Sequence, residues 1–477
     1  MKIRLPFRNL RHWFKRVVKG HGLVPDRNLI NTPEQIENFR EWKACDESWY
    51  GSPRILMASG HGYGNVGDEA QCGACIDRWK RVAPTAKITL FSPSPGYTES
   101  VHGQQCQWAP RVAWFRCNTG GPYFAESKPF ERFYFWLKLR LIISAHLLKL
   151  GIPLLVCNPR EASILNHLYD HDLLHISGGG FLTGKTRSRL WENCLLMKIC
   201  RILEIPYILT GHNIGVFQNN RDKRVAKMGL RGASYIGLRD RMISQREIAE
   251  IGIEGPHVES TCDDALFCDA LEIEQIKKRI GDVGGDPEQT WVAVNFHHWG
   301  QDESQRDRIE QRFAELCDHI VAELGYQTIF IAMTPSDVEP EQRVIGKMQQ
   351  PAYQLQYSPD YKVARGLIAA SQFVFTMKHH PIVFAQGEGV PVVAVALDSY
   401  YHHKNLGALA NTETPELLLD EKSFYEQTAQ LKLRQTIENR EQIVAKLKRW
   451  TDEMKMLELV PYQNTLAILA KQREGSR

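Results

Sequence analysis

Positions 59–71, SGHGYGNVGDEAQ, hold the densest run of residues suited to binding chemistry in this chain. The G-x-G-x-x-G spacing inside it matches the phosphate-binding turn of dinucleotide folds, where glycine lets the backbone approach a ligand. The match fails a second test, because no acid for a ribose hydroxyl stands about twenty residues further on. Asp68 and Glu69 would also repel a pyrophosphate at the start of the following helix. We therefore interpret the segment as a loop that brings backbone, and the carboxylate of Asp68, close to another kind of ligand.

Three further polar or glycine-rich turns follow apolar runs in the first half of the chain. They read HISGGGFL at 175–182, TGHNIG at 210–215 and GLRDRMIS at 237–244. In open α/β sheets, ligands bind at the carboxyl ends of the strands, so we expect these turns to form one binding floor. The residues assigned to this floor are Gly64, Asn65, Gly67, Gly179, Gly180, His212, Arg239 and Asp240.

A lysine and several histidines follow apolar runs in the second half. The segment FTMKHHPIVFA places Lys378, His379 and His380 directly after a buried strand, and His297 and His298 follow another. A cation and an imidazole on such a turn are suited to holding an anion and moving a proton near neutral pH. Lone histidines are more often structural, and the surroundings of His380 favour a direct role for it.

The elements that must position these turns alternate between short β-branched runs and longer helical patterns, which is typical of parallel strands joined by helices. The chain is therefore predicted to be α/β, with two doubly wound, Rossmann-like sheets facing each other across a cleft. Residues 130–150 predict a packed amphipathic helix, and 307–324 a second helix. The predicted strands are 55–58, 88–91, 153–157, 173–176, 207–209 and 235–238, then 291–294, 328–331, 373–376 and 392–395.

The turn-rich segment GDVGGDP at 281–287 marks the link between the two series. We predict a basic arm over 1–50, an N-terminal domain over 51–270 on the acceptor side, a C-terminal domain over 288–450 on the donor side, and an extension over 451–477. The charged pattern at 423–448 predicts a helix that packs back across the domains or pairs with another subunit.

Composition narrows the class of protein. The chain has 477 residues, 43% hydrophobic, and a net charge of only +4, which does not call for nucleic acid as a partner. Its first twenty residues, MKIRLPFRNLRHWFKRVVKG, carry seven Lys or Arg and no acid. They form either a basic amphipathic helix on an anionic membrane face or a solvated arm.

The eleven cysteines, an odd number with no cleavable signal ahead of them, favour reduced thiols in the cytoplasm, where the protein could lie peripherally on the inner membrane face. Cys72 and Cys75 form a C-x-x-C, which we interpret as two small helix residues rather than a redox or metal site. No carboxylate and histidine set has metal-ligand spacing, so we expect no metal and no cofactor.

Six motifs in this order resemble the polysaccharide pyruvyl transferase family: GNVGDEA, SGGGFLTG, TGHNIGVF, LRDRMIS, TMKHHPIVFAQGEGVPVVAV and LDSYYHHKNLGAL. The likeness runs from about residue 55 to about residue 409. It implies two Rossmann-like halves, as in GT-B glycosyltransferases, and transfer of a pyruvyl group from phosphoenolpyruvate to sugar hydroxyls, forming a ketal. The acceptor would be a glycan or lipid-linked sugar of cell-envelope or exopolysaccharide synthesis, and the protein could be a homo-oligomer.

The chain departs from this family pattern at three places. Lys378 stands where the family usually has arginine, which keeps the charge but loses the planar, two-pronged grip on an anion. His297 and His298 stand where an arginine is expected, and Ser399 and Tyr400 replace a Pro-Lys pair.

The working hypothesis assigns a role to each candidate. Lys378 and Arg239 would hold the carboxylate and phosphate of the donor, and His380 would deliver or relay a proton. Asp68 would orient or deprotonate a sugar hydroxyl, or would simply cap its helix.

Two other functions stay open. In a GT-B-like glycosyltransferase that uses a nucleotide sugar, His297, His298 and Lys378 would pair with phosphates. In a non-catalytic member of the family, the same cleft would bind a glycan without chemistry.

Overall fold

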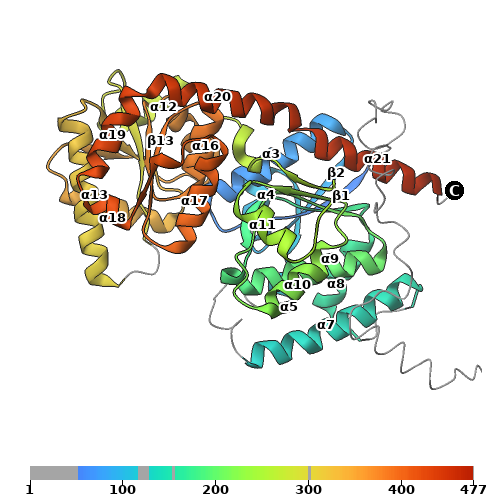
Figure 1. Ribbon diagram of the computed structural model, residues 1–477. Coiled ribbons are helices and arrows are strands. Elements are labelled where there is room, and N and C mark those ends of the chain that lie inside the picture. Colours follow the sequence, from blue (N-terminus) through green and yellow to red (C-terminus); the bar gives the residue numbers. More distant parts are fainter. Residues whose placement is uncertain (1–51, 116–127, 153–155, 299–301, 476–477) are drawn as a thin grey trace, which may run out of the picture.

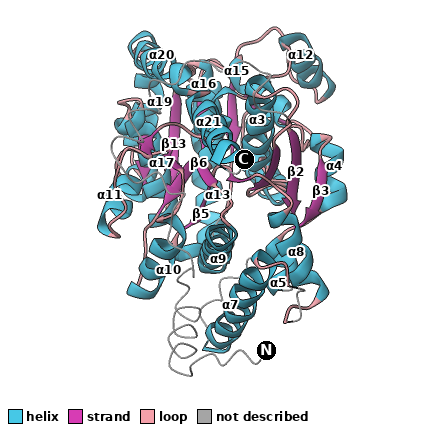
Figure 2. Ribbon diagram, turned by 90° about the vertical axis from the view of Figure 1, so that its right-hand side faces the viewer, coloured by secondary structure: helices cyan, strands magenta, loops and turns pink. Residues whose placement is uncertain are grey.

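The computed structural model describes residues 52–115, 128–152, 156–298 and 302–475. Two parallel sheets stand side by side, each covered by helices on both faces (Figures 1 and 2). The predicted basic arm over 1–50 lies outside the described residues. Among the described helices, none is long and apolar enough to cross a bilayer.

The first sheet has the strand order β3-β2-β1-β4-β6-β7-β8, and β5 pairs with β6. All its pairings are parallel. Its strands are β1 (Arg54–Ala58), β2 (Lys87–Ser92), β3 (Gln105–Trp108), β4 (Leu173–Ile176), β5 (Gly179–Leu182), β6 (Tyr207–Ile214), β7 (Tyr235–Leu238) and β8 (Val258–Ser260).

The second sheet has the order β11-β10-β9-β12-β13-β14 and is also parallel. In both sheets the chain adds strands on one side of a central strand and then on the other, which is the doubly wound arrangement. Ligands bind such sheets at the carboxyl ends of the strands. The strands are β9 (Trp291–Asn295), β10 (Gln327–Phe330), β11 (Ala352–Gln354), β12 (Val374–Thr376), β13 (Val392–Ala396) and β14 (Leu418–Asp420).

Helices cover the first sheet on two faces that the alternation of strand residues defines. In β1, Leu56 and Ala58 join the core under α7 and α9, whereas Ile55 and Met57 join the core under α3 and the last helix, α21. The helices that follow the first strands are α3 (Val66–Val82), α4 (Pro95–His102), α5 (Pro110–Phe115), α7 (Lys128–Lys149), α8 (Pro159–Tyr169), α9 (Arg187–Leu203), α10 (Asn220–Leu230), α11 (Ile243–Glu250) and α12 (Ile273–Asp282).

The helices of the second half are α13 (Glu303–Ala322), α14 (Val338–Lys347), α15 (Tyr361–Ala369), α16 (His379–Glu388), α17 (Ser399–Asn411), α18 (Glu421–Tyr425), α19 (Thr428–Glu438), α20 (Arg440–Leu457) and α21 (Val460–Gly475). Helix α20 runs from the second sheet toward the first, and α21 packs on α3 and β7 (Figure 1). The ring of Tyr462 on α21 meets that of Trp79 on α3 edge to face, with 4.9 Å between centroids. Residues 423–448, predicted as one helix, are divided among α18, α19 and α20, and α20 packs back across the two halves, one of the two outcomes expected for this segment.

Helix α3 belongs to both halves of the molecule. Cys75 and Trp79 face the first sheet, whereas Val66, Ala70 and Ala74 share one apolar core with α15 and α16 of the second. The GNVGD loop at the start of α3 is therefore placed at the junction between the sheets.

The apolar runs predicted nine of the strands, and the structure differs at one run. Residues 153–155 lie outside the described part, and Val156 and Cys157 form no strand, because the chain bends there and enters α8 at Pro159. The missed strands β3, β5, β8, β11 and β14 are short, and each contains polar residues or glycine instead of a continuous apolar run.

Candidate functional site

The GNVGD loop is fixed by Asn65, which is the N-cap of α3. Its Oδ1 accepts hydrogen bonds from the backbone N–H groups of Gly67 (3.1 Å) and Asp68 (3.5 Å). The capping role that the sequence allowed for Asp68 is thus performed by Asn65. A Cβ at Gly60 would lie 2.9 Å from Cγ of Asp68, so glycine there makes room for the half-buried Asp68 carboxyl group.

This loop touches the second half of the chain through its glycines. The hydroxyl of Tyr357 donates to the carbonyl oxygen of Gly64 at 2.6 Å. A Cβ at Gly67 would lie 1.9 Å from Cγ of His380, so the imidazole packs directly on the glycine backbone. Any side chain at position 67 would displace this ring, which explains the glycine in chemical terms. His380 and Asp68 are thereby brought to one place from opposite halves of the sequence.

His380 stands in the first turn of α16 and is buried, with 7% of its surface exposed. Burial lowers its pKa to about 3, with Asp263 opposing the shift and Lys404 adding to it. His380 is therefore neutral near pH 7, and its Nε2 has no hydrogen-bond partner among the described residues. A neutral imidazole with a free ring nitrogen and so low a pKa is a weak base, suited to relay a proton between two groups rather than to hold one.

Arg239 reaches the same place from the end of β7. Its Nη1 donates to the buried Asp263, and its Nε donates to Asn213. Its Nη2 is buried and has no partner among the described residues. One edge of the guanidinium is thus held by protein groups while the other is left for an anion, which is an arrangement typical of carboxylate and phosphate recognition.

Asp240 and His379 support Arg239 rather than face the cleft. Asp240 accepts from the backbone of Ile243 (2.7 Å) at the start of α11 and from Nδ2 of Asn213 (2.5 Å). His379 lies 3.6 Å from the Asp263 carboxylate, measured from Nε2 to Oδ2. Burial and the charge of Arg239 hold the pKa of His379 well below its usual value.

Three more residues lie at this place: Arg189 and Lys404, which the sequence reasoning did not single out, and Tyr400, which it noted only as a departure from the family pattern. A Cβ at Gly180 would lie 3.3 Å from Nη2 of Arg239, 3.3 Å from Oη of Tyr400 and 3.4 Å from Cε of Lys404. The side chains of Arg239, Tyr400 and Lys404 therefore meet over the backbone of Gly180. Lys404 lies inside the LDSYYHHKNLGAL motif, which could have pointed to it. Arg189 looks in the sequence like any basic residue of a helix.

Burial changes the charges of this cluster. The pKa of Lys404 falls to about 7 because the ammonium is desolvated and stands near Arg239, with Asp68 opposing the shift. Burial raises the pKa of Asp68, and the positive charges of Arg189 and Lys404 oppose that shift. We call Arg189, Arg239 and Lys404, together with Asp68 and His380, the cleft cluster. Three cations stand against two acids, Asp68 and the Asp263 that binds Arg239, so the balance of charge in and around the cleft cluster favours an anion.

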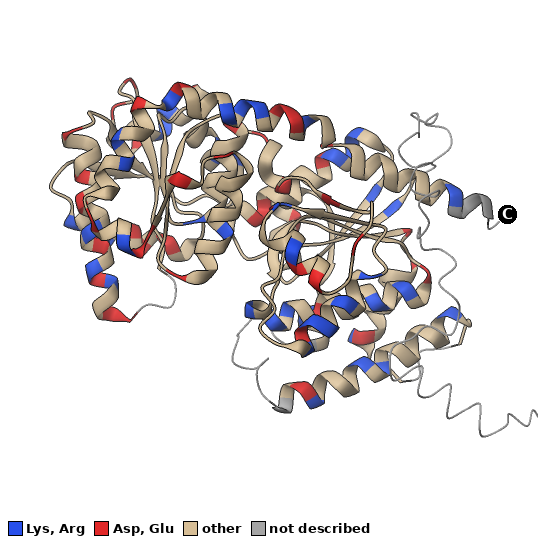
Figure 3. Ribbon diagram, in the orientation of Figure 1, with Lys and Arg blue, Asp and Glu red and all other residues tan. Residues whose placement is uncertain are grey.

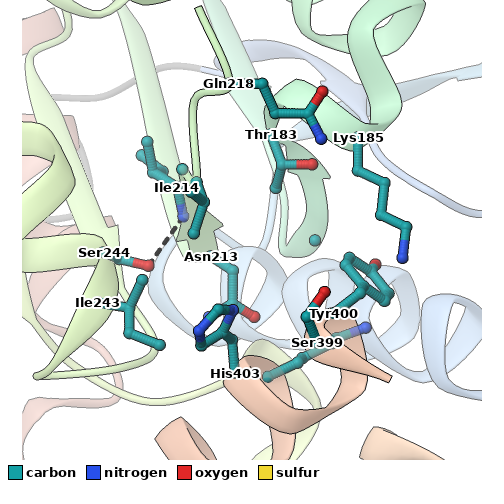
Figure 4. Close-up of a pocket in the computed structure, with 14 residues that line it drawn as sticks. Thr183, Lys185, Asn213, Ile214, Gln218, Ile243, Ser244, Ser399, Tyr400 and His403 are labelled. Carbon is teal, nitrogen blue, oxygen red and sulfur yellow. Dashed lines mark hydrogen bonds between the residues drawn. The ribbon is translucent and has the colours of Figure 1, made fainter. Parts of the chain in front are cut away.

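A cavity of about 160 Å³ opens beside the cleft cluster (Figure 4). Its walls come from the turns after β5 and β6, from the start of α11 and from the first turns of α17. The Tyr400 ring lies near two cations there, with Nζ of Lys185 at 4.7 Å and Nζ of Lys404 at 5.7 Å from the ring centroid. The polar groups labelled around it are Thr183, Asn213, Gln218, Ser244, Ser399 and His403.

Lys378, expected to grip the donor with Arg239, has a different partner. Its Nζ lies 2.7 and 2.8 Å from the two carboxylate oxygens of the buried Asp337 and 3.0 Å from Oγ1 of Thr334. Nδ1 of His297 binds the same carboxylate at 2.8 Å. Lys378 therefore forms a closed ion pair within the second half, and Lys404 is the lysine that the structure places beside Arg239.

The other predicted binding residues have contacts within the fold. His298 binds Glu310 at 2.8 Å, on the side of α13. Nε2 of His212 lies 3.1 Å from the carbonyl oxygen of Ile176, and burial lowers the pKa of His212 to about 4. A Cβ at Gly179 would lie 2.2 Å from the Phe181 ring, so this glycine makes room for an aromatic side chain.

The C-x-x-C pair is packed inside α3. Cys72 and Cys75 are fully buried, and burial raises both thiol pKa values well above their usual range. Over the described ranges, no group of three His, Cys, Asp or Glu side chains has a geometry that could hold a metal ion.

Several solved structures share this architecture. HepE from Anabaena, in complex with UDP, is 16% identical over 89% of this chain and 100% of its own, with a TM-score of 0.50. UDP-GlcNAc 2-epimerase from Neisseria meningitidis, bound to UDP-GlcNAc, is 11% identical over 86% of this chain and 100% of its own, with a TM-score of 0.51. At these identities the likeness shows the fold alone, which is GT-B-like, as predicted.

Sequence comparison is more specific than the structural likeness. A search of curated protein sequences gives no match to this chain. The family profile described as polysaccharide pyruvyl transferase matches residues 65–399, a span that begins at the cap of α3 and ends at the start of α17, and so includes Asp68, Arg239 and His380. The chain belongs to the polysaccharide pyruvyl transferase family.

Proposed function

We propose that this protein transfers a pyruvyl group from phosphoenolpyruvate to hydroxyls of a glycan or lipid-linked sugar at the cytoplasmic face of the membrane, forming a ketal without a metal or cofactor. The observation that carries the proposal is the cleft cluster. Arg239, with a free guanidinium edge, Arg189 and Lys404 surround one place where a small dianion or trianion would be neutralised.

The cleft cluster also supplies groups for proton transfer. Arg239 and Lys404 hold the carboxylate and phosphate of the donor by charge-assisted hydrogen bonds. A first sugar hydroxyl adds to C2 of the donor, and neutral His380 relays its proton toward the methylene carbon C3. Phosphate leaves C2 with its bonding electrons, and a second hydroxyl adds there to close the ketal. Asp68, whose raised pKa favours proton uptake, passes the second hydroxyl proton to the departing phosphate.

Calorimetric titration with phosphoenolpyruvate tests the donor site without knowledge of the acceptor. We expect saturable binding by the wild type and at least about tenfold weaker binding by Lys404→Met, because one charge-assisted contact is worth about 1.5–3 kcal/mol. Lys422→Met, an exposed lysine of the second half, is the matched control and should bind as the wild type does. No binding by the wild type, or no effect at Lys404, would contradict the donor site.

The pH dependence of donor affinity tests the contribution of the Lys404 ammonium group. Because its pKa is about 7, the free protein loses this charge as the pH rises from about 6 to about 8, and donor affinity should fall. Lys404→Arg keeps its charge over that range and should flatten the profile. A wild-type affinity that stays constant above pH 7 would show that Lys404 does not bind the donor.

A glycosyltransferase that uses a nucleotide sugar is the second candidate, because its fold would be the same. The side chains that would hold its diphosphate, Lys378, His297 and His298, are bound to the carboxylates of Asp337 and Glu310. UDP and GDP titrations beside phosphoenolpyruvate decide between the two. Binding of a nucleotide diphosphate, without binding of phosphoenolpyruvate, would replace the proposed function. Glycan binding without binding of either donor would indicate a non-catalytic member of the family.

A further inference from the structure

Helix α7 is apolar on both its inner and its outer side. The inner stripe, with Phe130, Tyr134, Leu137 and Leu141, is buried against α9 and the core of the first half. A helix on the surface of a protein normally turns polar residues outward. In α7 the outward side instead exposes Phe135 (42%) and Trp136 (59%).

Further apolar side chains are exposed beyond the end of α7. Leu150, Ile152 and Val156, beyond its C-terminus, are also exposed. We call this set the α7 face: Phe135, Trp136, Leu150, Ile152 and Val156. Exposed aromatic and aliphatic side chains on a helix that is already buried along its inner stripe mark a candidate interaction site.

The charge around the α7 face is positive. The helix carries five basic residues and one acid, Glu131, which is paired with Arg187 and Arg221. Two of the five, Arg140 and Lys149, pair with Glu161 and Glu204, so the exposed positive charge comes from Arg132 and from α10. The neighbouring α10 exposes Arg221, Arg224 and Lys227, while its acid, Asp222, is buried. The ion pair between Arg221 and Glu131 links the N-terminal ends of the two helices. Figure 3 shows basic residues along both helices, and Figures 1 and 2 place α7 at the outer end of the N-terminal half.

We propose that the α7 face, with the exposed basic residues of α10, is a docking surface for an anionic lipid bilayer. Trp and Phe beside Lys and Arg form the composition of helices that lie in the membrane interface, where aromatic rings enter the headgroup region and cations pair with lipid phosphate. This surface is separate from the cleft cluster and does not depend on the proposed reaction.

The distribution of charge favours a bilayer over two other occupants of the α7 face, a second copy of the chain and the chain's own first twenty residues. A second copy of the chain would bring the same basic rim against the first, and like charges oppose such an interface. The first twenty residues carry seven basic side chains and no acid. The exposed basic residues of α10 would repel this segment, whereas an anionic bilayer would attract both.

Vesicle flotation of the full-length protein tests the proposal. We expect binding to vesicles of phosphatidylcholine with 30% phosphatidylglycerol, little binding to pure phosphatidylcholine, and weaker binding at higher salt. The double variant Phe135→Glu/Trp136→Glu should bind at least about tenfold more weakly. Trp108→Glu, at an exposed tryptophan (55%) on the edge strand β3, is the control and should bind as the wild type does.

A second pair of variants tests the basic rim. Arg224→Glu/Lys227→Glu should weaken binding to the anionic vesicles and reduce its salt dependence, while folding, followed by thermal unfolding, stays unchanged. Equal binding of the wild type and the Phe135/Trp136 variant would overturn the proposal. So would a wild-type dimer in light scattering that the same variant converts to a monomer without any change in flotation.

Discussion

Gly67 and His380 come from different halves of the chain, yet the imidazole of one packs on the backbone of the other. This contact explains the glycine of the GNVGD loop better than phosphate binding does. The loop brings backbone close to a histidine ring, and Asp68, which follows at once, faces the cations Arg189 and Lys404.

Gly67→Ala tests this contact. A Cβ 1.9 Å from Cγ of His380 must displace the ring or the loop, and such overpacking costs about 1–3 kcal/mol. We expect a small loss of stability with at least about tenfold lower pyruvyl transfer, measured with any acceptor that the wild type uses. Gly346→Ala, a helical glycine with open space around its Cβ position, should leave both unchanged. Activity that survives Gly67→Ala would exclude a direct role for His380.

Lys378 offers a second test at this scale, because the structure gives it a structural partner. Lys378→Met removes the cationic partner of the buried Asp337 carboxylate, which keeps His297 and the backbone N–H groups of Met333 and Thr334, and removing one partner of a buried ion pair costs about 3–5 kcal/mol. The double variant Lys378→Met/Asp337→Asn should recover part of this loss in urea unfolding. A stable Lys378→Met protein that fails to bind phosphoenolpyruvate would restore the role that the sequence gave to Lys378.

At the scale of elements, α3 and the C-terminal helices join the two halves. Helix α3 packs on both sheets, and the junction between α20 and α21 is attached to it by Glu458, which binds Arg78 at 3.0 Å and Arg81 at 3.2 Å. Arg78 and Glu458 are buried, with side-chain exposures of 3% and 6%. Because α3 carries the GNVGD loop, this junction also supports the cleft cluster.

Glu458→Gln should therefore lower the free energy of unfolding. It leaves the Arg78 guanidinium with Asp264 at 3.6 Å as its remaining charged partner, and we expect a loss of about 3 kcal/mol in the free energy of unfolding. Glu453→Gln, on α20, breaks an exposed pair with Arg241 of the first half and should cost less than about 1 kcal/mol. Equal effects of the two variants in urea unfolding would show that the junction does not stabilise the fold.

At the scale of the whole molecule, the closely packed halves bury several histidines. Burial lowers the pKa of His61 and His212 to about 4, and that of His175 and His380 to about 3. Nε1 of Trp79 donates to Nδ1 of His175 at 3.0 Å, which fixes the neutral ring with its proton on Nε2. Protonating this ring would break that hydrogen bond.

The free energy of unfolding should fall as the pH drops from about 6.5 to about 4. Over this range the unfolded histidines bind protons while the buried ones do not, and each contributes up to about 1.4 kcal/mol per pH unit. His61→Gln should reduce the slope of stability against pH, whereas His403→Gln, at an exposed position, should leave it unchanged. Urea midpoints at several pH values give this slope, and a stability that rises on acidification would contradict the prediction.

Local sequence patterns were sufficient for the framework of the fold. Buried parallel strands are continuous apolar runs, so Leu173–Ile176 and Tyr235–Leu238 were predicted to the residue. The order of six motifs also identified the family and, through it, the GT-B-like architecture. Strands such as Gln105–Trp108 were missed because their pairing with neighbours, rather than an apolar run, makes them strands.

The membership of the cleft cluster was decided by tertiary structure. The sequence determined that Asp68, Arg239 and His380 follow glycine turns or strands, because those patterns are local. It could not show that Asp337 neutralises Lys378, or that Lys404 stands beside Arg239 over Gly180, since both depend on contacts between distant segments. The charge of a side chain is written in the sequence, but its partner, its desolvation and hence its pKa exist only after the halves have packed together.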